Sequence, residues 1–170
     1  MVNPWEENIN TFIKLANKHG VRMLMVGGGA VNFHGYQRHS ADVDFWIDTQ
    51  EENFKNLVLV FNEMGYELKD FPEAVKTRQQ NISVKFSPDE LSLELITHFS
   101  VNKSFNQAYE EAEIATVQGM PLLKWRVLSF DDLITSKAKS RRHKDLLDIQ
   151  ELQRIKAASK SQHEGPNSEA

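Results

Sequence analysis

Strict alternation over residues 41–48, with aliphatic and phenyl side chains at the odd positions and Asp42, Asp44 and Trp46 among the even ones, is the pattern that most constrains the fold of this 170-residue chain. Successive side chains of a β-strand point to opposite faces of a sheet, so the segment predicts a strand with one buried face. Asp42 and Asp44 share the other face, where two uncompensated carboxylates repel each other. Such a pair is stable on a solvated strand face, or when a divalent cation lies between the oxygens. The apolar face carries Val43, Phe45 and Ile47.

A run of three glycines lies thirteen residues before this strand, counted from Gly28 to Asp42. Residues 21–26 predict a buried strand that runs into the glycines, and residues 30–34 have helical character. Between a strand and a helix, exposed backbone N–H groups can hold a phosphate, and glycine lets the phosphate approach closely. The alternative is that Gly27 and Gly28 form a plain tight turn.

The remaining periodicity mixes helices and strands irregularly, so we expect an α+β (or mixed α/β) fold around one sheet. We expect residues 1–157 to form the domain and residues 158–170 to form a disordered tail. Helix starts are indicated by the capping pairs Asn3 with Glu6, Thr49 with Glu52, and Ser129 with Asp132, and Gly20 indicates the end of the first helix. The expected helices span residues 4–19, 50–64, 103–112, 130–140 and 144–157, and the further strands span residues 66–71, 81–86, 91–97 and 114–117.

Composition excludes several classes of protein. The chain has no cysteine, which excludes disulfide scaffolds, Cys-ligated zinc, iron–sulfur clusters and thiol catalysis. Its 20 Lys and Arg residues against 24 Asp and Glu residues argue against a broad, non-specific nucleic-acid binder. No apolar run approaches the roughly 20 residues of a membrane span, and the N-terminus lacks the order of a signal peptide. We therefore expect a cytoplasmic protein without a membrane partner.

Two further charged features stand out. Glu94 alternates with leucines in the strand expected over residues 91–97, so it faces away from the apolar side as a third carboxylate. Five of the eight residues over 137–144 are basic, and on one helix Lys137, Arg141 and Lys144 would share a face. This basic face could bind phosphate groups of a ligand. The alternative is a solvent-exposed basic stripe that pairs with acidic side chains. Its possible acidic partners are Asp131, Asp132, Asp145 and Asp148.

The sequence has an apolar residue followed by two glycines, then a spacer of about a dozen residues, then the pattern Asp-apolar-Asp-apolar. This order resembles the signature of the DNA polymerase β-like nucleotidyltransferase superfamily. The longer string VGGGAVNFHGYQRHSADVDFWID resembles a small bacterial branch, related to the abortive-infection type nucleotidyltransferases. SLELIT resembles that branch's strand with the third carboxylate, and LSFDDLITSKAKSRRHKDLLDIQEL resembles its closing helical segment. The three motifs occur in the family's order, and the resemblance covers residues 20–155.

The resemblance implies a nucleotidyltransferase fold, with one mixed sheet flanked by helices, and a site that uses Mg²⁺ or Mn²⁺ with a nucleoside triphosphate (NTP) as substrate. Gly27 and Gly28 match the phosphate-binding turn, and Asp42 and Asp44 match the metal ligands. Glu94 matches the third carboxylate, which in this branch is more usually Asp. The resemblance thereby makes the three carboxylates both metal ligands and catalytic residues.

Other positions of the matched strings are expected at the nucleotide. Arg38 and Ser40 resemble the family's Arg-x-Thr/Ser before the carboxylates, and Lys137, with Arg141 and Lys144, is expected at the phosphates. The alternative for Arg38 is an ion pair with Asp42 or Asp44. Two aromatic positions also stay open: Trp46 stacks on a base or wedges against a helix, and His34 belongs to the site or packs at a helix end.

The implied reaction is two-metal in-line transfer of a nucleoside monophosphate from an NTP to an acceptor hydroxyl, with Glu94 accepting the hydroxyl proton. The acceptor is left open among RNA, protein and a small molecule, and a homodimer or a protein partner is possible for so short a chain. The alternative is a catalytically weak or inactive module that binds a nucleotide or a partner, such as one half of a toxin–antitoxin pair.

Overall fold

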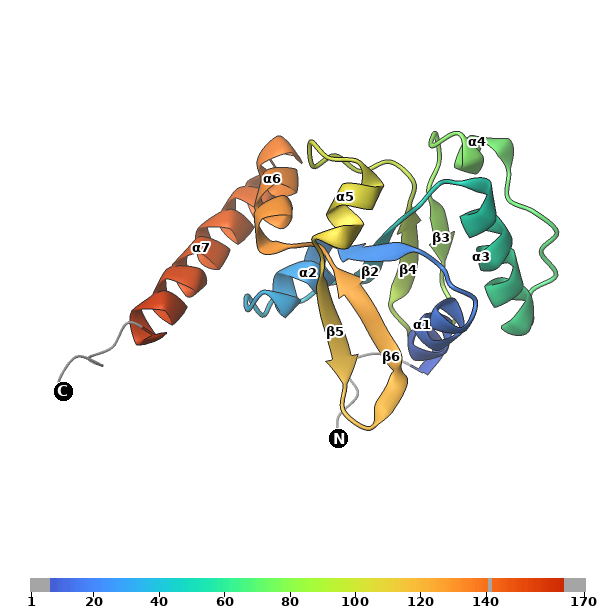
Figure 1. The fold of residues 1–170 in the computed structure, drawn as a ribbon, viewed down its shortest axis with the longest axis horizontal. Coiled ribbons are helices and arrows are strands. Elements are labelled where there is room, and N and C mark those ends of the chain that lie inside the picture. The colour runs from blue at the N-terminus through green and yellow to red at the C-terminus, as the bar shows by residue number, and fades with distance from the viewer. Residues whose placement is uncertain (1–6, 141, 164–170) are drawn as a thin grey trace.

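A mixed six-stranded sheet, in the order β3-β4-β2-β1-β6-β5, forms the centre of the molecule (Figure 1). The computed structural model describes residues 7–140 and 142–163. The strands are β1 (Met23–Val26), β2 (Asp42–Ile47), β3 (Ile82–Val84), β4 (Ser92–Ile96), β5 (Glu113–Val117) and β6 (Met120–Val127). The helices are α1 (Glu7–Lys18), α2 (Gly27–Phe33), α3 (Glu51–Glu63), α4 (Glu73–Lys76), α5 (Phe105–Glu110), α6 (Phe130–Ser140) and α7 (His143–His163). The expected α+β fold with one mixed sheet flanked by helices is therefore confirmed.

The register of the central strands places the acidic residues together. β2 is antiparallel to β1 and parallel to β4, so Asp44 is paired with Val26 on one side and with Glu94 on the other. Paired residues of neighbouring strands point to the same face of a sheet. Asp44 and Glu94 therefore share a face, as the alternation predicts, and Asp44 lies beside the end of β1 where the glycines begin.

α1 and α3 cover the apolar face of β2. The ring of Phe45 lies 6.4 Å from that of Phe12 in α1, and Phe12 lies 5.7 Å from Phe61 in α3, measured between ring centroids. All three side chains are buried, and burying a side chain of this size stabilises the fold by about 1.5–3 kcal/mol. The alternating pattern of residues 41–48 is thus explained by packing against these two helices.

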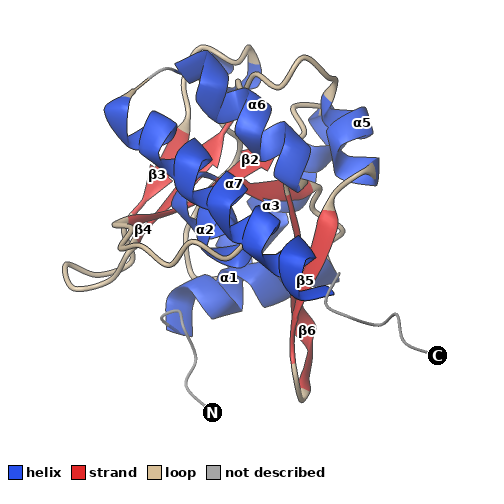
Figure 2. Cartoon of the chain, turned by 90° about the vertical axis from the view of Figure 1, so that its left-hand side faces the viewer, coloured by secondary structure: helices blue, strands red, loops and turns tan. Residues whose placement is uncertain are grey.

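Helices α6 and α7 lie on the side of the molecule that faces the viewer in Figure 2, where α7 crosses in front of α2 and α6 lies next to α7. Trp46, on the same face as Asp44, packs against Phe105 of α5 and against Phe99, with ring centroids 5.1 and 5.3 Å away. Trp46 is only 6% exposed. It wedges against a helix, so the structure favours that interpretation over stacking on a base.

Two of the expected helix-end signals are confirmed. Gly20 has φ +69° after α1, and the N–H of Val21 donates to the carbonyl of Ala16 at 2.9 Å, which is a glycine C-terminal cap. At the start of α6 the N–H of Asp132 donates to the hydroxyl of Ser129 at 3.2 Å. The Asn3 cap lies outside the described residues.

The expected capping box at Thr49 is wrong. The residue that caps α3 is Gln50, and its side chain makes no capping hydrogen bond. Instead the carboxylate of Asp48 accepts from the N–H of Gln50 at 3.3 Å. A carboxylate near a helix N-terminus is favourable, so Asp48 replaces the threonine that the sequence suggested.

The strand expected over residues 66–71 is also wrong, because these residues form a loop that leads into α4, a helix the sequence analysis did not identify. Apolar residues recur there because they pack on α3: Tyr66 and Phe71 both contact Phe61, with ring centroids 5.9 and 6.2 Å away. Such packing needs no strand partner, and β3 rather than this loop forms that edge of the sheet.

The structure differs from expectation at three further places, one of which, β6, is a strand that was not expected. The glycines form the first turn of α2 rather than a separate turn before it. β6 occupies residues 120–127, where Pro121 and basic residues interrupt the pattern typical of a strand. α7 continues to His163, past the expected end at residue 157, and residues 164–170 lie outside the described residues. In the described part of the chain, every helix is too short or too polar to cross a membrane.

Candidate functional site

Most of the residues expected at the nucleotide meet around one pocket of about 330 Å³. Three segments form it: the β1–α2 junction, the segment that leads into β2, and the α6–α7 junction. Eight of the ten residues expected at the site line the pocket. These are Gly27, Gly28, Arg38, Ser40, Asp42, Asp44, Lys137 and Lys144; His39, Ala41 and Arg142 complete the lining.

The two glycines allow other side chains to come close to the backbone. Gly27 has φ +63°, and a Cβ added there would lie 2.4 Å from Oδ2 of Asp44. A Cβ on Gly28 would lie 2.6 Å from the hydroxyl oxygen of Ser40. The carboxylate of Asp44 and the hydroxyl of Ser40 occupy the space that a side chain at these two positions would need. Glycine is therefore required at both positions to assemble the pocket.

Asp44 is the strongly perturbed acid of the pocket. Its burial, and then the negative charges of Asp42 and Glu94, raise the pKa of Asp44 to about 6 from its ordinary value of 3.8. The positive charges of Lys144 and Lys137 act in the opposite direction. The three carboxylates are thus close enough to repel one another, and a positive charge brought beside Asp44 would relieve this repulsion.

Glu94 does not line the pocket. It lies beside Asp44 in register, and its Oε1 accepts a hydrogen bond from the hydroxyl of Ser83 at 2.6 Å. Among residues 7–140 and 142–163, no three carboxylate or histidine side chains are arranged to hold a metal ion by themselves. The expected three-carboxylate cage is therefore not formed, because Glu94 is directed to β3.

The donor set at the pocket fits Mg²⁺ or Mn²⁺ in a different way. Mg²⁺ is commonly bound by one or two carboxylates together with substrate phosphates and water, rather than by a cage made only of protein ligands. Asp42 and Asp44 supply two carboxylates at the pocket, and burial together with the neighbouring negative charges raises the pKa of Asp44, so a bound cation would be favourable beside it. These two residues would hold the ion.

The basic residues do not share one helical face, so this expectation is wrong. α6 ends at Ser140 and α7 begins at His143, which places Lys137 and Lys144 on different helices. Arg141 lies outside the described residues. Both lysines still reach the pocket because the chain reverses between the two helices, and Arg142, at this junction, joins them. Arg142 belongs to the basic run over residues 137–144, but it does not share the helical spacing of Lys137, Arg141 and Lys144, which is why that spacing did not point to it.

Lys137 is buried and held by two buried aspartates. Its ammonium nitrogen lies 3.1 Å from Asp145 and 2.9 Å from Asp148. Burial alone would raise the pKa of Asp145, but hydrogen bonds from Arg142, Ser140 and Lys137 lower it to about 2. The alternative of pairing with Asp145 and Asp148 is therefore confirmed for Lys137, although the pairs are buried rather than part of a solvated stripe.

Arg38 pairs with Asp148 and not with Asp42 or Asp44. Its Nε lies 2.9 Å from Oδ1 of Asp148, and its Nη2 donates to Oδ2 at 3.1 Å. His34, in contrast, has a packing role. Its Nε2 lies 2.8 Å from the carbonyl oxygen of Leu128, and its ring packs on Phe130, so the helix-end interpretation of His34 is confirmed.

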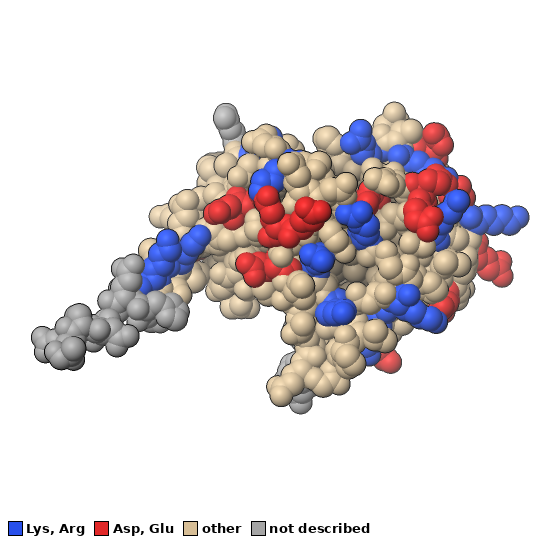
Figure 3. All heavy atoms as spheres, in the orientation of Figure 1, with Lys and Arg blue, Asp and Glu red and all other residues tan. Residues whose placement is uncertain are grey.

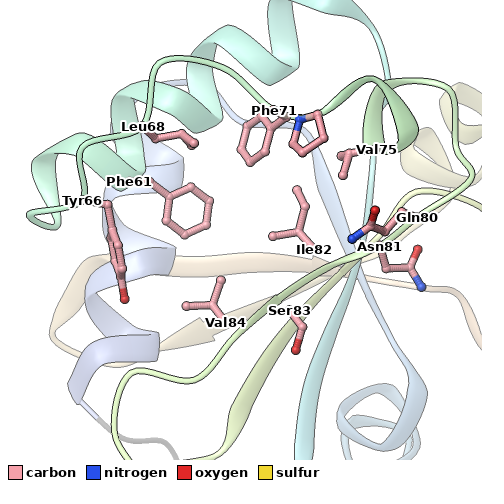
Figure 4. A pocket seen from close by; sticks show the side chains of 11 residues that line it. Phe61, Tyr66, Leu68, Phe71, Val75, Gln80, Asn81, Ile82, Ser83 and Val84 are labelled. Atoms are coloured by element: carbon pink, nitrogen blue, oxygen red, sulfur yellow. The ribbon is translucent and has the colours of Figure 1, made fainter.

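A second pocket, of about 310 Å³, lies on the opposite face of the sheet (Figure 4). Ile82 and Val84 of β3 point into it, whereas Ser83 between them points away, toward the face that carries Glu94. Aromatic side chains from α3 and the following loop complete its walls: Phe61, Tyr66 and Phe71. The charged pocket and this apolar pocket are therefore separated by the sheet itself.

Charge is unevenly distributed on the outer surface. On the face shown in Figure 3, acidic side chains gather around α5 and α6, and Lys or Arg side chains lie on α7. The exposed Glu110, Glu111 and Asp131 belong to these elements or follow them directly. Within the described residues, this face thus presents no continuous basic surface of the kind that binds nucleic acid without sequence preference.

A family model described as nucleotidyltransferase of unknown function (DUF6036) matches residues 6–159. A search of the curated proteins found no match. The family match includes the glycines, the carboxylates of β2 and the α6–α7 junction, which are the segments that meet at the charged pocket. The chain therefore belongs to this family of nucleotidyltransferases of unknown function (DUF6036).

Proposed function

We propose that this protein transfers a nucleoside monophosphate from an NTP to an acceptor hydroxyl, with Mg²⁺ or Mn²⁺. The single observation that carries the proposal is the charged pocket, where the carboxylates of Asp42 and Asp44 meet the cationic groups of Lys137, Arg142 and Lys144. Carboxylates suit a divalent cation and the cationic side chains suit phosphates, so the two halves of the pocket match the two parts of a metal–NTP complex.

Each half has a distinct role in the proposal. Asp42 and Asp44 hold the ion, and Lys144 and Arg142, which are exposed at the α6–α7 junction, bind the outer phosphates. Gly27 and Gly28 bring Asp44 and Ser40 close to the β1–α2 backbone. Positioned charges of this kind supply most of the catalysis in phosphoryl transfer, because they stabilise charge that develops on the phosphate oxygens.

The bonding changes follow from the reaction class. The acceptor oxygen forms a bond to the α-phosphorus, the bond from that phosphorus to the bridging oxygen breaks, and pyrophosphate leaves in line. An ion held by Asp42 and Asp44 would neutralise the phosphate oxygens and increase the acidity of the acceptor hydroxyl. Glu94, next to Asp44 in register, is the proposed acceptor of the hydroxyl proton, a role that requires its carboxylate to turn from Ser83 toward the pocket. A two-metal form of the reaction would need Glu94 as a further ligand after the same turn.

A second proposal is a module that binds nucleotides or a protein partner with little or no turnover. The observation in its favour is that the described carboxylates form no three-ligand cage, since Glu94 accepts a hydrogen bond from Ser83. Calorimetry distinguishes the two proposals. Tight NTP binding without transfer to any acceptor favours the module, and labelled product favours the enzyme.

The experiment that tests the proposed activity uses α-labelled NTPs, Mg²⁺ and a cell extract, compared with the Asp44→Asn protein. The matched control is Asp89→Asn, which removes the same charge from an exposed turn. Label transferred by the wild type and by Asp89→Asn but not by Asp44→Asn supports the proposal. Equal transfer by Asp44→Asn would contradict the assigned role of this carboxylate, and the labelled product identifies the acceptor as RNA, protein or a small molecule.

A further inference from the structure

Asp148 lies where three segments meet: the segment before β2, α6 and α7. It comes from α7, is 1% exposed, and contacts two cationic side chains at once. One is Arg38, from the segment before β2, at 2.9 and 3.1 Å, and the other is Lys137 of α6, at 2.9 Å. Removing a carboxylate that is buried between two cations leaves both charges without their partner.

The geometry of Arg38 shows what this contact does for the pocket. Nη2 of the guanidinium donates a hydrogen bond to Oδ2 of Asp148, and Nε lies at ion-pair distance from Oδ1 without the geometry of a second hydrogen bond. The remaining nitrogen, Nη1, lies 3.7 Å from the place that a Cβ on Gly28 would occupy. The guanidinium therefore lies over the glycine end of the pocket, held on its other side by the carboxylate of Asp148.

Lys137 is restrained in the same way. An ammonium group has three N–H donors, and those of Lys137 face Asp145 at 3.1 Å and Asp148 at 2.9 Å. The side chain is 5% exposed, yet it lines the pocket. Two aspartates thus hold three cations, Lys137, Arg38 and Arg142, and the group keeps a positive charge toward the pocket.

We propose that Asp148 is a positioning residue of the phosphate pocket: it holds Arg38 over Gly28 and Lys137 at the pocket wall, so that both meet a polyphosphate without rearranging. This inference rests on the proposed function, because it assumes that the pocket binds the phosphates of an NTP. The physical basis is preorganisation, since a cation fixed before binding loses little freedom when the anion arrives.

The direction in which one substitution changes the affinity for an anion distinguishes positioning from simple electrostatics. Asp148→Asn removes a negative charge beside the pocket, so charge alone would strengthen the binding of an anion. Loss of positioning would weaken it, by between about 10- and 100-fold, the range typical when a residue that orients a ligand-binding group is replaced. The probe is inorganic triphosphate in metal-free buffer, titrated by calorimetry.

A double-mutant cycle shows whether Asp148 acts through Arg38. We expect Arg38→Ala to weaken triphosphate binding in the wild type and to have little further effect in Asp148→Asn, because the arginine is already displaced. We expect Asp148→Glu, which retains the carboxylate, to recover part of the affinity. Arg38→Ala also keeps the test valid if Asp148→Asn does not fold, since Arg38 lies in a segment outside the helices and strands.

Glu151→Gln is the matched control, because it removes a negative charge from the next turn of α7, where Glu151 pairs with Arg154 at 2.9 Å. Its affinity for triphosphate should remain within twofold of the wild type. Unchanged or stronger binding by Asp148→Asn, or no effect of Arg38→Ala in the wild type, would overturn the inference alone. Absence of triphosphate binding by the wild type would overturn the proposed phosphate pocket as well.

Discussion

The carboxylate of Asp44 occupies the space that a side chain at Gly27 would need. A Cβ built on Gly27 comes to 2.4 Å from Oδ2 of Asp44, well inside the distance at which atoms touch. Because Gly27 follows β1 directly and Asp44 lies in β2, this contact connects the glycine turn to the acidic strand. The two halves of the sequence motif are therefore one packed unit.

Gly27→Ala should destabilise the protein for two reasons. Its φ of +63° costs an L-residue about 1–2 kcal/mol, and the new methyl group must displace Asp44. Gly20→Ala is the control, because Gly20 has φ +69° and nothing within 4 Å of an added Cβ. Urea unfolding should show a larger loss for Gly27→Ala. Equal losses would mean that Asp44 is not held against Gly27.

Asp44→Asn should stabilise the metal-free protein at pH 8. Burial and the neighbouring carboxylates raise the pKa of Asp44 to about 6, so the stability that comes from its protonated form is lost as the pH rises through 6. Asparagine has the same shape without the charge. Each kcal/mol gained should raise the melting temperature by about 2–4 °C, and the gain should shrink toward pH 5.

Added Mg²⁺ should make the wild type melt at a higher temperature than Asp44→Asn. The ion binds the folded wild type and raises its melting temperature, but it leaves the melting temperature of Asp44→Asn unchanged. The Asp89→Asn protein should respond to Mg²⁺ as the wild type does. A melting temperature of Asp44→Asn at or below that of the wild type in metal-free buffer at pH 8 would contradict the repulsion among the three carboxylates.

Acid should abolish the contribution of Asp145 to stability. Although burial opposes it, hydrogen bonds from Arg142, Ser140 and Lys137 lower the pKa of Asp145 to about 2, against 3.8 ordinarily. The contribution is therefore complete above about pH 5 and is lost as the pH falls from about 4 to 2. Asp145→Asn should cost about 3–5 kcal/mol at pH 7, because Lys137 stays buried with one partner fewer.

The measurement is urea unfolding of the wild type and Asp145→Asn at pH 7, 5 and 3, with the exposed Asp131→Asn as control. The difference between the wild type and Asp145→Asn should be constant from pH 7 to 5 and smaller at pH 3. A difference that stays the same at pH 3 would show that the carboxylate of Asp145 is not held by these hydrogen bonds.

Trp46→Phe should lower stability without changing nucleotide affinity. The indole packs on Phe99 and Phe105, so the smaller ring leaves space beside α5 at a cost of about 1–2 kcal/mol. Chemical unfolding measures the loss, and ATP titration with Mg²⁺ measures the affinity. A large fall in affinity at unchanged stability would return Trp46 to the role of a base-stacking residue.

The sequence by itself predicted the local parts of the fold and of the site well. Alternation over residues 41–48 predicted β2 with its acidic face, and the glycine signal predicted the end of α1 at Gly20. These features depend on residues close in the sequence, whose side-chain period and backbone preferences are intrinsic. The predicted helix end at residue 140 is also where α6 ends, so the single helical face assumed for Lys137, Arg141 and Lys144 could not form.

Only the tertiary structure decided which charges meet. Arg38 and Asp148 are 110 residues apart, and their pairing depends on how α7 crosses the end of the sheet. Glu94 has the face that the sequence predicted, yet the hydroxyl of Ser83 on β3 determines where its carboxylate points. The physical reason is that a buried charge must find a partner within hydrogen-bond distance, and the packing of distant segments determines which partner is there.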